Sequence, residues 1–328
     1  MFRILSIDGG GIKGAFPAAF LCALQDSLSC PIADHFDLIA GTSTGGIIAL
    51  GLGLGLSPAE ILKFYTDLGA AIFPASQKWS TRLKHYLTAK YSSDPLEDAL
   101  KSAFGDRLLG HSRQRLVIPS FSALTGNIYV YKTPHDPRFE SDWRMSAVEV
   151  AMATSAAPSY FPPYIAPNYI AHLDGGMWAN NPTGNAVVEA IGILGAKPTE
   201  IRVLSLGCTR TANSFVLRNA GLFAWRKKAL DASFSGQSFG SMGIAALLVG
   251  HSNILRVDPT VSHYKVDTTS RRRRSMASLG HAEHSGYGHP ESLRIQRRYR
   301  FRSCAARIRK PEQDTASDRC RLSESGPR

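Results

Sequence analysis

The sequence has no apolar run long enough to cross a bilayer, and it contains few cysteines. Its longest apolar stretch, residues 45–56, is rich in glycine and falls short of the roughly 20 residues that a membrane-spanning helix requires. The chain opens directly into the apolar run 2–7, without the basic segment, apolar core and cleavage site of a secretory signal. The five cysteines lack paired spacing and the ten histidines form no ligand pattern, so neither a disulfide framework nor a metal site is predicted. We therefore expect a cytoplasmic protein with reduced thiols and no cofactor.

Acidic residues are fewer than basic ones, but most of the excess of basic residues lies in one part of the chain. The chain has 38 Lys and Arg against 26 Asp and Glu, a net charge of +12, and the part from Arg271 onward holds 15 of these basic and 6 of these acidic residues. Residues 1–270 are therefore nearly neutral, which argues against a nucleic-acid polymer as partner. We predict one domain over 1–270 and a basic C-terminal segment over 271–328. This segment is a solvated end or attracts phosphates or an anionic membrane surface, and its change of character after about residue 285 is also what an altered reading frame would produce.

Strand-like apolar runs alternate with longer helical patterns along residues 1–270, which predicts an α/β fold with a mainly parallel sheet covered by helices. The expected strands lie at residues 2–7, 36–40, 116–118, 128–131, 170–173 and 201–206. Helix starts are predicted at Ser57 and Ser146, where a serine cap precedes a glutamate three residues later, and at Asp94.

The segment GTSTG at residues 41–45 fits a nucleophile elbow, in which a serine occupies a sharp turn between a strand and a helix. The pattern is common by chance, but here an apolar strand precedes it and a helical run follows. Ser43 would then lie at the positive end of a helix. An ordinary glycine turn with a capping serine is the alternative.

The segment DGGGIKG at residues 8–14 places three consecutive glycines between a strand and a helix. Such a turn can direct unhindered backbone N–H groups at an anion, either a phosphate or the oxyanion of a tetrahedral intermediate. The glycine spacing of the dinucleotide fingerprint is met, but Asp34 precedes the second strand instead of ending it.

A third segment, DGG at residues 174–176, follows the expected strand at 170–173. Catalytic residues in open α/β sheets are commonly found where a strand ends, so Asp174 is a candidate base. An aspartate that only accepts hydrogen bonds from turn amides is the alternative.

Together and in this order, the three segments resemble the motifs of the patatin-like phospholipase family, with similarity over roughly residues 2–260. The resemblance implies a three-layer α/β/α fold and a Ser-Asp dyad without histidine. On this chain it implies Ser43 as nucleophile, Asp174 as base and an oxyanion hole formed by Gly9, Gly10 and Gly11. The positions that would support these motifs are Asp8, Lys13, Gly14, Gly41, Gly45 and Gly175.

Within the family, the chain looks similar to bacterial phospholipases that act as effectors of cyclic-oligonucleotide antiphage defence. The resemblance implies a membrane phospholipid as substrate, a cyclic dinucleotide as activator and a location at the inner membrane when the enzyme is active. Similarity to these proteins extends to residues 276–283 and is lost afterwards. The sequence leaves the oligomeric state open.

The chemistry follows from the residue types. A serine hydroxyl needs a base to become a nucleophile, and Asp174 would take its proton, while glycine amides would stabilise the oxyanion. Two alternatives stay open: a histidine-dependent esterase or acyltransferase, for which His172 lies two residues before Asp174, and a nucleotide-binding signalling module without catalysis. Lys13 could favour an anionic head group, and residues 74–93, which hold aromatic and basic side chains, are the expected membrane contact.

Overall fold

A mixed sheet lies at the centre of the computed structural model, which describes residues 1–72, 90–167, 169–211 and 222–261. Eight strands form this sheet in the order β5-β6-β3-β2-β1-β7-β9, and β4 pairs with β3 outside this path. The strands of the sheet are β1 (Phe2–Ile7), β2 (Leu38–Gly41), β3 (Arg115–Ser122), β4 (Ile128–Lys132), β5 (Tyr164–Ile165), β6 (Ala171–Asp174), β7 (Ile201–Leu206) and β9 (Ile254–Val257). The short strands β8 (Arg210–Thr211) and β10 (Thr260–Val261) pair separately.

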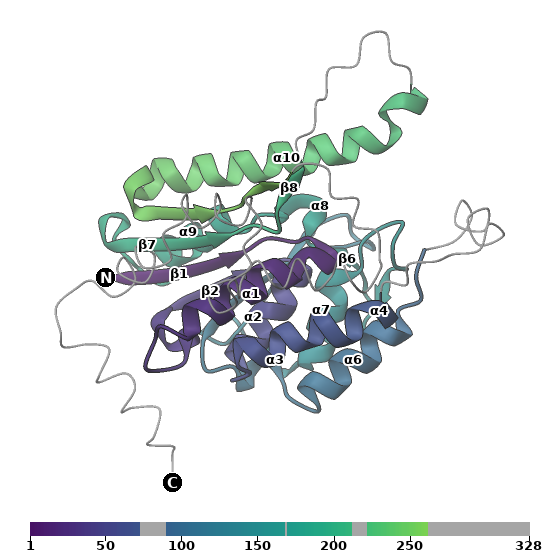
Figure 1. The fold of residues 1–328 in the computed structure, drawn as a ribbon, viewed down its shortest axis with the longest axis horizontal. Helices are drawn as coiled ribbons and strands as arrows, with labels where there is room; N and C mark the ends of the chain where they lie inside the picture. Colours follow the sequence, from purple (N-terminus) through teal and green to yellow (C-terminus); the bar gives the residue numbers. More distant parts are fainter. Residues whose placement is uncertain (73–89, 168, 212–221, 262–328) are drawn as a thin grey trace, which may run out of the picture.

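Helices cover both faces of the sheet (Figure 1). The helices are α1 (Ala15–Gln25), α2 (Thr44–Gly53), α3 (Pro58–Lys63), α4 (Gly69–Ile72), α6 (Asp94–Phe104), α7 (Ala147–Ser155), α8 (Gly176–Ala179), α9 (Thr183–Gly192) and α10 (Leu222–Val249), and short 3₁₀ turns include η1 (Gly11–Gly14). Helices α9 and α10 lie on one face, and α1, α2, α3, α6 and α7 lie on the other. The predicted three-layer α/β/α architecture is confirmed.

The parallel part of the sheet is its centre, β3-β2-β1-β7-β9, whereas β4, β5 and β6 add antiparallel pairs at one edge. The bounds of β1 and β7 agree with the predicted strands. The antiparallel edge and strand β9 were not predicted.

Two hydrophobic clusters occupy the two faces of the sheet because strand side chains alternate. Ile4 of β1 and Leu38 of β2 join the cluster beneath α9 and α10. Their neighbours Leu5 and Ile39 join the larger cluster with α1, α2, α3, α6 and α7. The sheet is thus covered on both faces, which explains why its central strands read as almost continuous apolar runs.

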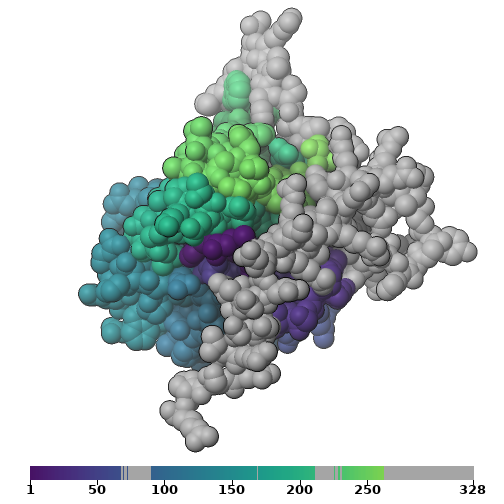
Figure 2. Space-filling model, turned by 90° about the vertical axis from the view of Figure 1, so that its left-hand side faces the viewer, coloured from purple at the N-terminus to yellow at the C-terminus, as the bar shows by residue number. Residues whose placement is uncertain are grey.

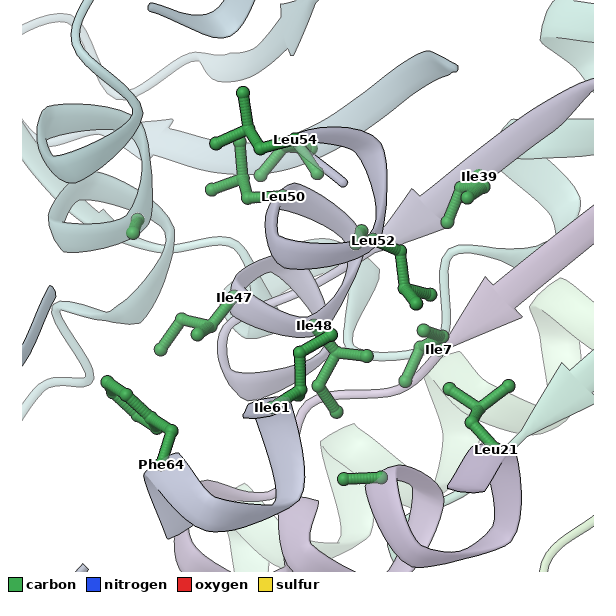
Figure 3. Close-up of a cluster of buried hydrophobic side chains, with 14 of the residues drawn as sticks. Ile7, Leu21, Ile39, Ile47, Ile48, Leu50, Leu52, Leu54, Ile61 and Phe64 are labelled. Atoms are coloured by element: carbon green, nitrogen blue, oxygen red, sulfur yellow. The ribbon is translucent and has the colours of Figure 1, made fainter. Parts of the chain in front are cut away.

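Helix α2 is buried along its whole length, since all ten of its residues are buried. Figure 3 shows Ile47, Ile48 and Leu50 of this helix among side chains from β1, β2, α1 and α3. A helix without a polar face can be stable only when it is surrounded by protein. The residue that precedes α2 is therefore held by a rigid, buried element.

The predicted helix starts are confirmed. Ser57 and Ser146 both form capping boxes, with Glu60 and Glu149 respectively. Helix α6 begins at Asp94, and its N-cap residue is Ser93. The serine side chain of each capping box accepts a backbone N–H group that would otherwise lack a partner in the first turn, whereas Ser93 makes no such side-chain hydrogen bond.

Several predictions concern residues outside the described ranges. Most of the expected membrane contact at 74–93 lies outside the described ranges, and the basic segment 271–328 lies entirely outside them. The proposed division of the chain into a domain and a C-terminal segment therefore stays a prediction. In Figure 2, α10 forms the light green surface above the teal of earlier residues of the chain. Among the described residues, we find no helix with the length and apolar character needed to span a bilayer.

Candidate active site

Ser43 occupies the sharp turn between β2 and α2. Its backbone has φ 54° and ψ −122°, a conformation that side-chain-bearing residues rarely adopt. The turn is tight: a Cβ on Gly41 would lie 2.1 Å from the carbonyl oxygen of Gly45, and a Cβ on Gly45 would lie 2.3 Å from that of Ile7. Glycine is therefore required at both positions, and the segment forms the predicted elbow with Ser43 at the N-terminus of α2.

Asp174 ends strand β6, and its carboxyl group is buried. The side chain of Ser43 lies close enough to this carboxyl group to lower its pKa. The N–H of Gly176 donates a hydrogen bond, of 2.6 Å, to Asp174 Oδ1. The two residues predicted as nucleophile and base, 131 positions apart in the sequence, are thus brought together.

Burial raises the pKa of Asp174 to about 6, while the nearby Ser43 side chain and the Gly176 N–H oppose this rise. A buried carboxylate loses hydration, which favours its protonated form. A base with a pKa near 6 is ionised at neutral pH and holds a transferred proton better than an ordinary aspartate does. This is the adjustment that general base catalysis requires.

Asp174 reaches the site on a strand that runs opposite to the parallel strands of the sheet. Strand β6 is antiparallel to β3, yet its last residue lies level with the turn that follows the carboxyl end of β2. It pairs with Ser120 of β3, whereas the end of β2 pairs with Val117 of the same strand. Ser43 and Asp174 meet because β3 extends past β2 and thereby places the end of β6 level with the elbow.

The glycine turn after β1 approaches Ser43 from the other side. A Cβ on Gly9 would lie 3.3 Å from the Cβ of Ser43, and the N–H of Gly9 donates to the carbonyl oxygen of Asn180 at 2.9 Å. The N–H groups of Gly10 and Gly11 donate to none of the described residues. Of the three glycines predicted to form an oxyanion hole, Gly9 therefore has its N–H occupied, and Gly10 and Gly11 have theirs available.

The remaining residues of the motifs pack closely around this turn. A Cβ on Gly10 would lie 2.3 Å from the Cβ of Cys208, whose Sγ donates to the carbonyl oxygen of Asp8 at 3.3 Å. Lys13 Nζ lies 3.5 Å from the carbonyl oxygen of Thr209, a long contact. Added Cβ atoms would also collide with neighbours at Gly14 and Gly175.

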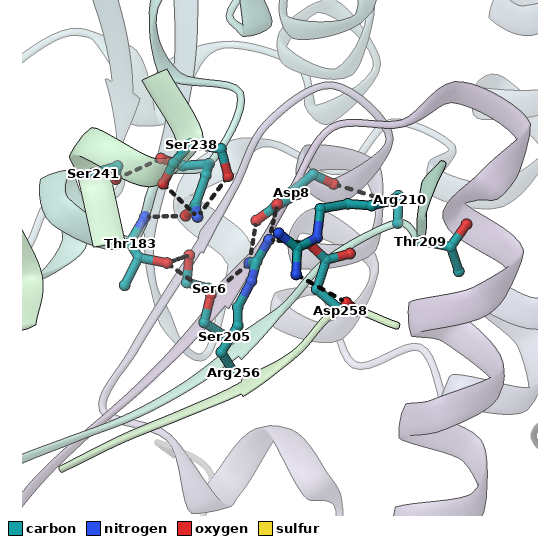
Figure 4. A network of polar contacts seen from close by, with 12 residues as sticks. Ser6, Asp8, Thr183, Ser205, Thr209, Arg210, Ser238, Ser241, Arg256 and Asp258 are labelled. Carbon is teal, nitrogen blue, oxygen red and sulfur yellow. Dashed lines mark hydrogen bonds and ion pairs between the residues drawn. The ribbon is translucent and has the colours of Figure 1, made fainter. Parts of the chain in front are cut away.

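Asp8 anchors the glycine turn through an ion pair with Arg256 of strand β9 (Figure 4). The guanidinium group donates to both carboxylate oxygens of Asp8, at 2.8 and 2.5 Å, and also contacts Ser205 and Asp258. Burial raises the pKa of Asp8 to about 6, while Arg256 opposes this rise. Asp258 in turn pairs with the more exposed Arg210.

His172 is buried, and its ring contacts side chains of β3 and β4. Its ring nitrogens lie 3.3 Å from Ser120 Oγ and 3.1 Å from Tyr131 Oη, and burial lowers its pKa. The histidine closest in sequence to Asp174 is therefore held by β3 and β4. Among the described residues, no group of three potential metal ligands is found.

Three residues contact the motifs although no sequence pattern pointed to them. Asn180 accepts the N–H of Gly9, Thr154 accepts the N–H of Ser43, and Arg256 binds Asp8. Of the three, Arg256 could have been found from the sequence. It interrupts the otherwise apolar run ILRV, and a charged side chain in such a run needs a buried partner. Thr154 and Asn180 are visible only once the fold is known.

Comparisons with known proteins agree with the motifs. Residues 5–187 match the sequence profile of the patatin-like phospholipases. A cGAMP-activated phospholipase of Pseudomonas aeruginosa is 37% identical over 250 residues, which cover 72% of each chain. The protein of the same name from Vibrio cholerae is 29% identical over 316 residues, 87% of this chain and 89% of that one. The crystal structure of VipD from Legionella pneumophila aligns with a TM-score of 0.40 and 12% identity, covering 84% of this chain and 66% of VipD.

The matched region holds the elbow, the glycine turn and the aspartate motif, and it accounts for more than half of the 328 residues. On this match and on the similarity to the Pseudomonas protein, the chain belongs to the patatin-like phospholipase family and is a lipid ester hydrolase.

Proposed function

We propose that this enzyme hydrolyses the acyl ester bonds of membrane phospholipids, with Ser43 as nucleophile and Asp174 as base. The observation that carries the proposal is the proximity of the Ser43 side chain to the buried carboxyl group of Asp174, whose pKa is raised to about 6. Asp174 would take the hydroxyl proton as Ser43 Oγ attacks the ester carbonyl carbon. The free N–H groups of Gly10 and Gly11, with the N-terminus of α2, would stabilise the negative charge on the carbonyl oxygen.

The second half of the reaction reverses these roles. Protonated Asp174 delivers its proton to the leaving lysophospholipid oxygen as the ester bond breaks, which leaves an acyl group on Ser43. Asp174 then takes a proton from a water molecule, whose oxygen attacks the acyl carbon. Release of the fatty acid returns the proton to Ser43 Oγ.

The names of the bacterial relatives support two finer proposals. Proteins that are 37% and 29% identical to this chain are called cGAMP-activated phospholipases, so we propose a cyclic dinucleotide as the activator and antiphage defence as the role. The substrate lies in a bilayer, and the enzyme would therefore act as a peripheral protein at the inner membrane.

Fatty-acid release from mixed phospholipid vesicles tests substrate and activator together. We expect the wild-type protein to release fatty acid with cGAMP present and much less without it, and Ser43→Ala to release none in either case. Release that survives Ser43→Ala would overturn the assigned nucleophile. Release that cGAMP and other cyclic dinucleotides leave unchanged would remove the activator and retain the enzyme.

The raised pKa of Asp174 predicts the acidic limb of the pH profile. Asp174 must be ionised to act as base, so kcat/KM for a soluble ester should rise with pH, with a midpoint near pH 6, and level off above it. A series of buffers at constant ionic strength between pH 4.5 and 8.5 measures this limb. A midpoint near 4, the value of an ordinary aspartate, would contradict the role of burial.

A further inference from the structure

Thr154, in the last turn of α7, is fully buried and lies beneath the elbow. Its hydroxyl group donates to the carbonyl oxygen of Pro119 in β3 at 2.5 Å. Because a hydroxyl has one hydrogen, its remaining capacity is that of an acceptor, and it accepts the backbone N–H of Ser43 at 3.0 Å. The side chain therefore links the nucleophile's backbone to the sheet, and both of its hydrogen bonds are buried.

The residues at the end of α7 also form hydrogen bonds with the backbone of Asp174, the proposed base, and of Gly175. The carbonyl oxygen of Thr154 accepts the N–H of Gly175 at 3.2 Å, and that of Ala156 accepts the N–H of Asp174 at 3.0 Å. The end of α7 thus contacts the nucleophile through a side chain and the base through the backbone. The relative position of Ser43 and Asp174 is set by one rigid element.

Ser43 needs such support because its backbone conformation is unfavourable. A residue with a side chain at φ 54° persists in that conformation only when the surroundings hold it there. The Ser43 N–H points to Thr154 and takes no part in the oxyanion hole, so the hydrogen bond serves the shape of the elbow. Removing the Thr154 hydroxyl would leave this N–H and the Pro119 carbonyl without partners in a buried position.

We propose that Thr154 is a positioning residue, whose hydroxyl holds the elbow so that Ser43 Oγ is kept beside the Asp174 carboxyl group. The proposal rests on the proposed roles of Ser43 and Asp174. A small displacement of the nucleophile lowers the rate of the chemical step far more than it lowers substrate binding. The signature is therefore a fall in kcat at nearly constant KM.

The test compares Thr154→Val, Thr154→Ser and Thr154→Cys in the full chain with a soluble ester. Valine has nearly the shape of threonine without the hydroxyl, and we expect kcat to fall by about 100-fold. Serine keeps the hydroxyl and should restore kcat to within about threefold of wild type. Thr133→Val is the matched control, because Thr133 Oγ1 also accepts a buried backbone N–H, that of Leu116 at 2.9 Å, away from the site. This control should lower the melting temperature and leave kcat unchanged.

The outcomes distinguish the proposal for Thr154 from the proposed dyad of Ser43 and Asp174. Loss of activity in Ser43→Ala and Asp174→Asn together with wild-type kcat in a folded Thr154→Val would overturn the role of Thr154 alone. Full activity in Ser43→Ala would overturn the proposed dyad instead. If Thr154→Val does not fold, the cysteine and serine variants decide, since a thiol is the weaker hydrogen-bonding group. Equal kcat in these two variants would overturn the proposal, and a fall of tenfold or more in the cysteine variant alone would support it.

Discussion

Asp174→Asn should lower kcat for a soluble ester by about 10²- to 10⁴-fold, the range that a positioned general base contributes. Asparagine has nearly the shape of aspartate and can still accept the N–H of Gly176, so the fold should persist, as circular dichroism and melting temperature can verify. It cannot take the proton of Ser43. The rate at which a fluorophosphonate labels Ser43 should fall in parallel, because this reaction also requires an activated hydroxyl.

Two controls sharpen this result. Asp142→Asn changes a carboxylate that accepts from Tyr129 Oη at 2.7 Å outside the proposed dyad, and it should leave kcat within about threefold of wild type. His172→Gln should do the same, because His172 contacts Ser120 and Tyr131 and has no place in the proposed mechanism. A severe loss in His172→Gln with near-normal turnover in Asp174→Asn would instead favour the histidine-dependent esterase. A protein that is neither labelled nor active in any form would favour the nucleotide-binding module.

Arg256→Met should reduce the free energy of unfolding by about 3 to 5 kcal/mol, the usual effect of removing one partner from a buried ion pair. The Arg256 side chain is 19% exposed, and its guanidinium group binds both carboxylate oxygens of Asp8 together with Asp258. Methionine fills a similar volume and leaves both carboxylates without this partner. Urea denaturation, followed by circular dichroism, measures the loss.

Arg210→Met is the matched control for this experiment. Arg210 also pairs with Asp258, but its side chain is 49% exposed, and pairs of this kind contribute about 0 to 1 kcal/mol. The double variant Asp8→Asn/Arg256→Met should recover part of the loss, since it removes an uncompensated buried charge. Equal destabilisation by the two arginine variants would contradict the assigned role of burial.

The local features of the site could be predicted from the sequence because they depend on neighbouring residues. Strand β1 is an apolar run that ends in the glycine turn, and the apolar run of β2 ends in the elbow. Both runs were predicted as strands. The pairing of β6 was less accessible, because a strand of four residues carries little information about its direction. Strand β6 brings Asp174 beside Ser43 although it runs antiparallel to β3, a direction that was not predicted.

The supporting contacts could not be predicted because they join distant positions. Ser43 and its acceptor Thr154 are 111 residues apart, and no local pattern distinguishes Thr154 from any other buried threonine. The Gly9 N–H illustrates a different limit. The motif indicates a run of glycines with accessible amides, whereas the occupation of one amide by Asn180 depends on how the chain folds back after β6.

The separation of 248 positions between Asp8 and Arg256 also has a consequence for protein synthesis. Translation adds about 5 to 20 residues per second, so the Asp8 carboxylate leaves the ribosome roughly 10 to 50 seconds before its partner does. During that interval the turn beside Ser43 lacks the guanidinium group that anchors it. The ion pair that anchors this turn is thus absent until residue 256 has been synthesised.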